Sequence, residues 1–457
     1  MSILAPGWTS LLYLLSAVCF ILALKGLSSP RSARRGNAIG AAGALLAVVT
    51  VFLSAKLENI PLILAAIAVG CAFAVPVARR VPMTQMPQLV ALFNGVGGGA
   101  AALVAVLELG SSGDPWVRLA VVFTLLAGSV SFAGSAVTVG KLQELINTRP
   151  LLFVGMPWAV AAVLLGAVAA GVVVLLTGSA GWALALLALG LAAGLLLVLP
   201  VGGADVPIVI SLLNAFTGLA VAASGVVLNN VLLLVAGTLV GASGTILTKV
   251  MASAMGRGVA GILFGAFRGG STAGSTAPSE RPVRSSSPED VAVQLGYAQR
   301  VVIVPGYGLA VAQGQHTVAE LATALAARGV EVVFAIHPVA GRMPGHMNVL
   351  LAEANVPYEA LRELDEVNPE FANTDIVLVV GANDVVNPAA KSSPGSPIYG
   401  MPILEVVQAQ QVVFLKRSMR PGFAGIENEL LHNPKTTLLF GDAKDSLAKV
   451  LGAVKAL

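Results

Sequence analysis

The run RVVIVPGYGLAV, residues 300–311, decides the fold of the C-terminal part of the chain. Arg300–Val304 is an apolar, β-branched run typical of a strand, and it ends at a Pro-Gly-Tyr-Gly turn. The turn belongs to a Gly-x-Gly-x-x-Val pattern, a partial dinucleotide fingerprint whose two glycines allow a tight turn and a close approach to a pyrophosphate. The candidate contacts in this loop are Gly306, Tyr307, Gly308, Ala310 and Val311.

Strands and helices alternate around this run. The pattern predicts further strands at 332–336, 376–380, 412–415 and 437–440, and helices at 316–328, 346–354, 402–409 and 445–454. Such alternation indicates an α/β doubly wound, Rossmann-like parallel sheet over residues 291–457. His316 and His337 have no partners implied by spacing, and we interpret both as structural.

Two further loops follow predicted strands, and doubly wound sheets bind ligands beyond the carboxyl ends of their strands. In Gly381-Ala382-Asn383-Asp384, the aspartate could face a ribose or a nicotinamide. In Lys416-Arg417-Ser418, two cations and a hydroxyl suit a 2′-phosphate, which would select NADP over NAD. The alternative for the two cations is a solvated strand end.

Residues 1–265 have the composition of a membrane domain. The whole chain is 56% hydrophobic and 11% charged, with a mean hydropathy of +0.86, whereas soluble proteins carry about 25% charged residues. A membrane-spanning helix needs about 20 apolar residues. Nine runs qualify: 8–26, 36–54, 60–78, 87–108, 118–140, 151–176, 181–200, 207–225 and 231–252. The count is open only at 181–225, where the seventh and eighth runs nearly join.

Positive charge orients these spans, because Lys and Arg favour cytoplasmic loops. With nine spans and an outside N-terminus, the loops on one side carry only Lys56 and Arg118. The other loops and the tail carry Lys25, Arg31, Arg34, Arg35, Arg79, Arg80, Lys141, Arg149, Lys249, Arg257 and Arg268. We therefore expect a cytoplasmic C-terminal domain. The net charge of +4 is too small to indicate nucleic-acid binding.

Two asparagines interrupt the apolar spans, and polar groups inside a membrane are hypotheses for function. Asn94 and Asn214 each lie seven residues into a span that enters from the same side, about 10 Å deep at 1.5 Å per residue. Equal depth predicts a direct or water-bridged pair. The alternative is helix–helix association through amide hydrogen bonds.

Asp205 lies just before the eighth run, in Gly202-Gly-Ala-Asp-Val-Pro207. One interpretation is a helix N-cap, and the other is a proton-carrying or gating carboxylate at the cytoplasmic mouth. Residues 266–290 are rich in Ser, Thr, Pro and Gly and predict a flexible tether. The two cysteines, Cys19 and Cys71, lie in apolar runs and indicate neither a disulfide nor a metal site.

Five motifs together resemble the beta subunit of the proton-translocating NAD(P) transhydrogenase. They are PGYGLAVAQ (305–313), HPVAGRMPGHMNV (337–349), GANDVVNP (381–388), KRSM (416–419) and LFGDAK (439–444). Gly202–Asp205 and Asn214 match the membrane part of that family. The resemblance covers the chain apart from the tether.

The resemblance implies an enzyme, the Re/Si-specific proton-translocating NAD(P)+ transhydrogenase. It implies that this chain binds NADP(H), that a partner alpha subunit binds NAD(H), and that hydride passes directly between the nicotinamides. Proton flow toward the cytoplasm would favour NADPH formation. It further implies a dimer of alpha–beta units among the lipids of a bacterial inner membrane, without nucleic acid.

The resemblance also implies roles for single residues. Lys416 and Arg417 would hold the 2′-phosphate, Asp384 would lie near the nicotinamide, and Arg342 would belong to a loop beside the site. The LFGDAK motif adds Gly441 and Asp442 as candidate contacts. Asp205, Asn214 and Asn94 would belong to the coupling and proton path.

The sequence departs from the family at two positions. The family often carries His at the position of Asn94 and commonly Tyr at the position of Phe423. Because an amide does not titrate near neutral pH, Asn94 could only organise water, and a titrating group would be Asp205 or a His of the partner. The competing function is a transporter or channel regulated by a cytoplasmic nucleotide-sensing domain.

Overall fold

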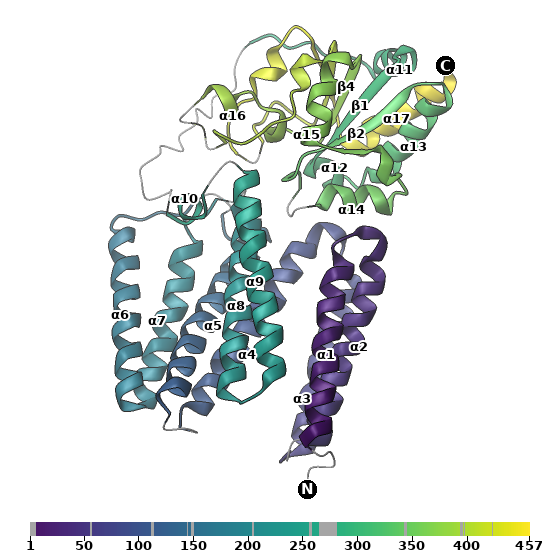
Figure 1. Cartoon of the computed structure of the whole chain (residues 1–457). Helices are drawn as coiled ribbons and strands as arrows, with labels where there is room; N and C mark the ends of the chain where they lie inside the picture. The colour runs from purple at the N-terminus through teal and green to yellow at the C-terminus, as the bar shows by residue number, and fades with distance from the viewer. Residues whose placement is uncertain are drawn as a thin grey trace. The chain divides into compact units, whose positions relative to one another are not determined.

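A computed structural model describes residues 6–54, 57–110, 114–143, 145–147, 150–202, 205–255, 258–264, 281–341, 345–393, 396, 398–422 and 424–457. Arg342, Phe423, residue 265 and residues 266–280 of the predicted tether lie outside the described residues. The chain divides into a helical unit, Met1–Val201 with Ile208–Thr248, and a sheet unit, Gly202–Pro207 with Lys249–Leu457 (Figure 1).

The described residues contain nine helices long and apolar enough to cross a membrane, as the sequence predicts. They are α1 Pro6–Leu27, α2 Pro30–Ser54, α3 Ile60–Arg80, α4 Met86–Leu107, α5 Pro115–Leu142, α6 Met156–Thr177, α7 Ala180–Val198, α8 Val206–Val227 and α9 Val231–Ala254. Because α7 and α8 are separate helices, residues 181–225 contain two candidate spans, as the sequence predicts.

Helix α5 is the most buried of the nine and packs against α4, α6 and α7. Its contact with α4 depends on small side chains. A Cβ added at Gly128 of α5 would lie 2.5 Å from the carbonyl oxygen of Gly98 on α4, and one at Gly98 would lie 3.0 Å from the Gly128 carbonyl. Small residues bring helices close where lipid supplies no hydrophobic drive between them.

In the described residues of the sheet unit, six parallel strands lie in the order β3-β2-β1-β4-β5-β6. They are β1 Arg300–Pro305, β2 Glu331–Ile336, β3 Leu361–Glu363, β4 Ile376–Val380, β5 Gln411–Lys416 and β6 Thr436–Phe440. This order confirms the doubly wound sheet. Successive strands are added on one side of β1 up to β3 and then on the other side from β4 onward, so the topological switch point lies between β1 and β4. The three-residue edge strand β3 was not predicted, because its sequence is short and largely polar.

Structural elements cover both faces of the sheet, as expected for a parallel sheet. Val301 and Ile303 of β1 face a core with α11 Pro288–Tyr297, α13 Gln315–Ala327, α14 His346–Glu353 and α17 Ala443–Ala456. Val302 and Val304 face the other core, built by α15 Leu364–Val367 and short 3₁₀ turns. Figure 1 shows these elements around β1, β2 and β4.

The prediction of a helix at 402–409 is wrong. The structure has only a 3₁₀ turn there, Val406–Gln408. The backbone N–H of Leu404 donates to the carbonyl of Val385 at 2.9 Å, and that of Glu405 donates to Oδ1 of Asn368 at 3.0 Å. These distant acceptors replace the i−4 carbonyls that a helix would use.

The described end of the predicted tether lies along the sheet. The backbone N–H of Ser286 donates to the carbonyl of Leu438 at 2.9 Å, and that of Leu438 donates to the carbonyl of Arg284 at 2.7 Å. Helix α11 then begins at Pro288, with the Ser287 hydroxyl accepting from the N–H of Asp290. The domain boundaries at 265 and 290 stay predictions.

Candidate functional site

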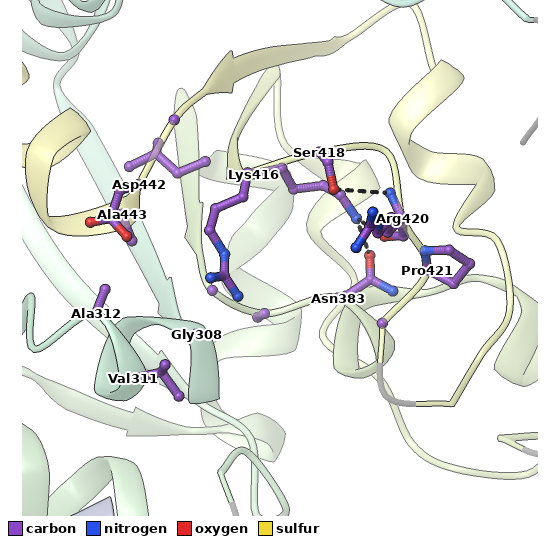
Figure 2. Close-up of a pocket in the computed structure, with 16 residues that line it drawn as sticks. Gly308, Val311, Ala312, Asn383, Lys416, Ser418, Arg420, Pro421, Asp442 and Ala443 are labelled. Carbon is purple, nitrogen blue, oxygen red and sulfur yellow. Dashed lines mark hydrogen bonds between the residues drawn. The ribbon is translucent and has the colours of Figure 1, made fainter. Parts of the chain in front are cut away.

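Four loops meet beyond the carboxyl ends of β1, β4, β5 and β6 and enclose a cavity of about 670 Å³. This is the position at which doubly wound sheets bind their ligands. Figure 2 shows the cavity, which is lined by Gly308, Val311, Ala312, Gly381, Ala382, Asn383, Leu415, Lys416, Arg417, Ser418, Arg420, Pro421, Gly422, Gly441, Asp442 and Ala443.

Glycines let the loops after β1 and β4 touch through their backbones. The N–H of Gly306 donates to the carbonyl of Val380 and that of Gly308 to the carbonyl of Gly381, each at 2.9 Å. A Cβ at Gly308 would lie 2.7 Å from Cα of Gly381, which itself has φ +69°. Both N–H groups have protein acceptors, and the two glycines allow the loops to pack closely.

Lys416, the last residue of β5, ties two loops together. Its Nζ donates to Oδ1 of Asn383 and to the carbonyl of Arg420, each at 3.2 Å (Figure 2). Burial lowers the pKa of the Lys416 ammonium from its ordinary value of 10.5, while the carboxylate of Asp384 opposes that shift. An ammonium has three donors, so one N–H of Lys416 is left for a ligand.

Asp384 anchors the loop behind the cavity. Its two oxygens accept from Nδ2 of Asn383 at 3.0 Å and from the N–H of Ala424 at 2.9 Å. Gly422 lies so close that a Cβ there would be 2.6 Å from both Asn383 Nδ2 and Asp384 Oδ1. Asp384 is not among the lining residues, and its carboxylate holds Ala424 by the backbone N–H and packs closely on Gly422.

Two arginines of the same loop present cations without protein partners. Arg417 and Arg420 are exposed at the cavity. Among the described residues, no hydrogen bond or ion pair is made by either guanidinium. Ser418 accepts from the N–H of Arg420 at 3.5 Å, which shapes the loop between them. Unpartnered guanidiniums beside a lysine form a site suited to a phosphate group.

The loop after β6 closes the cavity beside β5. The N–H of Gly441 donates to the carbonyl of Lys416 at 3.0 Å. Asp442 is the N-cap of α17, accepting from the N–H of Lys444 at 2.9 Å and of Asp445 at 3.4 Å. Its carboxylate therefore has a structural role at the rim of the cavity.

The cavity brings together ten of the predicted contacts. They are Gly308, Val311, Gly381, Ala382, Asn383, Lys416, Arg417, Ser418, Gly441 and Asp442. Gly306, Tyr307, Ala310 and Asp384 lie beside it without lining it, and Arg342 is outside the described residues. Sequence reasoning missed Arg420, although its position three residues after Arg417 in the same loop was a usable signal.

Asn94 links three membrane helices. Its Nδ2 donates to Oγ of Ser131 at 3.2 Å and of Ser135 at 3.0 Å, both on α5. Ser131 in turn bonds to the hydroxyl of Thr217 on α8 at 2.5 Å. In the described part of the chain, Asn94 Oδ1 is buried without a hydrogen-bond partner, and no hydrogen bond joins Asn94 to Asn214.

Asp205 is buried, at 6% exposure, immediately before the start of α8. Its N–H donates to the carbonyl of Gly202 at 3.0 Å, which forms a turn at the entry to the helix. Over the described ranges, no group of three or more His, Cys, Asp and Glu side chains could hold a metal ion.

A family model described as the NAD(P) transhydrogenase beta subunit matches residues 9–453. The chain belongs to this family. A relative named NAD(P) transhydrogenase subunit beta, from Rhodospirillum rubrum, is 47% identical over 454 residues, covering 97% of this chain and 98% of the relative. The protein of that name from one strain of the same species matches with the same figures.

Membership in the transhydrogenase beta subunit family confirms the resemblance drawn from the sequence motifs. It accounts for a chain that joins nine membrane-spanning helices to a Rossmann-like sheet. The chain is thus a multi-pass membrane protein and the beta component of an oxidoreductase that involves NAD(P), with an alpha subunit as its partner. The roles of single residues are not decided by family membership.

Proposed function

We propose that this chain binds NADP(H) in the cavity at the carboxyl edge of the sheet, while the partner alpha subunit binds NAD(H). The observation that carries the proposal is the set of cations at the cavity. Lys416 has one donor to spare, and the guanidiniums of Arg417 and Arg420 make no hydrogen bond or ion pair with the described residues. NADP differs from NAD by a 2′-phosphate, and such a cation cluster favours the additional negative charge.

The residues of the cavity fit a dinucleotide without further groups. The volume of about 670 Å³ lies in the usual range for small-molecule sites, about 300–1,000 Å³. Lys416, Arg417 and Ser418 would hold the 2′-phosphate, and Asn383 would lie along the ligand. Asp384 would act indirectly, by holding the loop that follows Arg420.

The nicotinamide supplies the hydride chemistry when it is bound, and the protein supplies position and exclusion of water. No side chain of the cavity has to act as an acid or base in that step. What this chain contributes is the fixed geometry of the β4 and β5 loops, which the Lys416–Asn383 hydrogen bond joins. Arg342 is expected in a loop beside the site.

Hydride transfer is proposed to be coupled to proton movement through the helical unit. A chain of hydrogen bonds runs from Asn94 on α4 through Ser131 on α5 to Thr217 on α8. Among the described residues, the buried Oδ1 of Asn94 has no hydrogen-bond partner, so it could accept from a water molecule. Asn94 would organise water without titrating, and Asn214 would lie along the same path. Asp205 would be the carboxylate that exchanges the proton at the cytoplasmic mouth.

The assembly and location follow from the same proposal. The membrane domain would extend over residues 1–265 and the NADP(H)-binding domain over 291–457, with 266–290 as the tether. We propose a dimer of alpha–beta units in a bacterial inner membrane, with the C-terminal domain in the cytoplasm. The excess of Lys and Arg in one set of loops supports that orientation.

The proposal is tested with the chain co-purified with its alpha subunit and reconstituted in liposomes. NADPH and an NAD analogue are added, and hydride transfer and lumenal pH are followed together. We expect transfer accompanied by a pH change that an uncoupler abolishes. NADPH binding without hydride transfer would instead support a transporter or channel with a nucleotide-sensing domain.

A further inference from the structure

Lys141, in the last turn of α5, is fully buried, at 0% exposure. Its Nζ donates to three backbone carbonyls: Val198 at 3.2 Å, Leu199 at 2.6 Å and Val201 at 2.6 Å. A protonated amine has three N–H donors and a neutral one has two. The three acceptors therefore match the ammonium form, and the whole hydrogen-bonding capacity of the group is used.

The three carbonyls lie at the end of α7 and just beyond it, and that of Val198 also accepts from the N–H of Val201 at 3.1 Å. Helix α7 ends at Val198, and the last carbonyls of any helix need other donors. A cation at this end is also favoured by the helix dipole. Among the described residues, no ion pair joins Lys141 to a carboxylate, so the charge is held by backbone oxygens alone.

Other contacts gather around the same point. On α4, Nε2 of Gln88 donates to the carbonyl of Leu142, the residue after the lysine, at 3.2 Å. The N–H of Leu151 donates to the carbonyl of Leu199 at 3.1 Å. The ends of α4, α5 and α7 are thus joined by hydrogen bonds around Lys141, which fixes the point from which the chain leaves α7.

The segment from Val198 to Val201, three of whose carbonyls Lys141 holds, leads directly to Asp205. Val201, held by Lys141, is followed by Gly202, whose carbonyl accepts from the N–H of Asp205. We propose that Lys141 is a positioning residue for proton coupling: by holding the carbonyl of Val201, it fixes the α7 end of the segment that leads to Asp205.

This inference rests on the proposed function, because a coupling role presumes that Asp205 handles the proton. A purely structural lysine would support folding and affect hydride transfer and pumping alike. A positioning lysine affects the number of protons moved per hydride transferred, while hydride transfer in the presence of an uncoupler continues. The ratio of the rate of proton movement to the rate of hydride transfer therefore distinguishes a positioning lysine from a purely structural one.

The experiment uses the reconstituted alpha–beta enzyme with Lys141→Met, which keeps the length of the side chain and removes the donors. We expect uncoupled hydride transfer to stay within about threefold of wild type and the proton-to-hydride ratio to fall at least fivefold. The matched control is Lys25→Met, an exposed lysine in the last turn of α1, for which the ratio should be unchanged.

If Lys141→Met does not assemble, Lys141→Gln, which keeps one amide group as donor, is measured against the same criterion.

Two results would overturn the inference while leaving the proposed function intact: an unchanged ratio in Lys141→Met, or failure of both Lys141 variants to assemble, which would make the lysine a folding residue. A wild-type enzyme that transfers hydride without moving protons would instead contradict the proposed function itself. The two failures are therefore distinguishable in one set of measurements.

Discussion

Lys416 joins two loops and lines the cavity with the same side chain. Two of its donors join the β4 and β5 loops through Asn383 and the Arg420 carbonyl, and burial lowers its pKa although Asp384 lies near. The residue therefore sets the shape of the cavity as well as its charge. Arg417 and Arg420 contribute charge alone, since their guanidiniums make no hydrogen bond among the described residues.

Substituting Lys416 by Met should weaken NADP(H) binding about 10- to 100-fold, since hydrogen bonds to charged groups contribute about 1.5–3 kcal/mol. The dissociation constant of NADPH is measured by equilibrium dialysis on the alpha–beta enzyme. Lys449→Met, on the exposed side of α17, is the control. NADPH binding that is equally tight in both variants would contradict the assignment of the cavity.

His337 shows how a buried titratable group can be structural. It is 1% exposed, and its Nε2 lies 2.7 Å from the carbonyl of Pro402, while its Nδ1 accepts from the N–H of Val339 at 3.2 Å. An accepting Nδ1 with a donating Nε2 is the neutral imidazole. Burial lowers the pKa of His337 from 6.5 to about 4, against the opposing effect of the Pro402 hydrogen bond.

This lowered pKa predicts a loss of stability in acid. Between pH 6.5 and about pH 4, His337 is protonated in the unfolded chain but stays neutral in the folded one. The free energy of unfolding therefore decreases as the pH is lowered through this range, by about 3 kcal/mol in all. Hydrogen exchange of the β2 amides in the full chain, followed as a function of pH, measures this change in the free energy of unfolding. His337→Gln should flatten this pH dependence, whereas substitution of the exposed His316 should leave it unchanged.

At the scale of the elements, the contact between the β1 and β4 loops depends on glycine for two separate reasons. Gly381 has φ +69°, a left-handed conformation that L-residues rarely adopt, and its neighbourhood has no space for a side chain. Gly329, after α13, has φ +86° with open space around it. Comparing alanine substitutions at Gly329 and Gly381 therefore separates the cost of the backbone conformation from the cost of steric overlap.

Gly329→Ala should destabilise the sheet unit by about 1–2 kcal/mol, the cost of the left-handed conformation for an L-residue. Gly381→Ala should cost about 1–3 kcal/mol more, because its Cβ would lie 2.5 Å from the carbonyl carbon of Gly308. Urea-dependent hydrogen exchange of β1 and β4 amides compares the two. Equal destabilisation would show that the loops can separate without loss.

At the scale of the whole molecule, the proposed coupling of hydride transfer to proton movement requires a group that changes its protonation. Asp205 is the candidate, because it is buried just before α8 and follows a segment fixed by Lys141. Asn94 cannot titrate near neutral pH, and its hydrogen bonds to Ser131 and Ser135 hold α4 against α5.

Asp205→Asn should abolish proton pumping while NADP(H) binding persists. Asparagine caps helices as well as aspartate does, so a capping role alone would survive the substitution. Lumenal pH and NADPH binding are measured on the same reconstituted enzyme. Asp114→Asn, which replaces the carboxylate that accepts from the N–H of Trp116 at the start of α5, is the control. Unchanged pumping in Asp205→Asn would refute the role in proton handling.

The sequence by itself determined the features that depend on local pattern. The nine spans follow from apolar runs of membrane length, and five strands follow from β-branched runs, because burial in lipid or inside a sheet imposes a local composition. The cations of 416–417 were visible because they directly follow such a run. The motifs at 305–313 and 381–388 were sufficient to indicate the family.

Only the tertiary structure decided which groups meet. The three-residue strand β3, the non-helical course of 402–405 and the cavity position of Arg420 depend on acceptors and neighbours far along the chain. Lys141, which the sequence suggested as a loop charge, is buried where its ammonium donates to the carbonyls of Val198, Leu199 and Val201. Hydrogen-bond partners of this kind are set by packing between distant segments, and no local pattern encodes them.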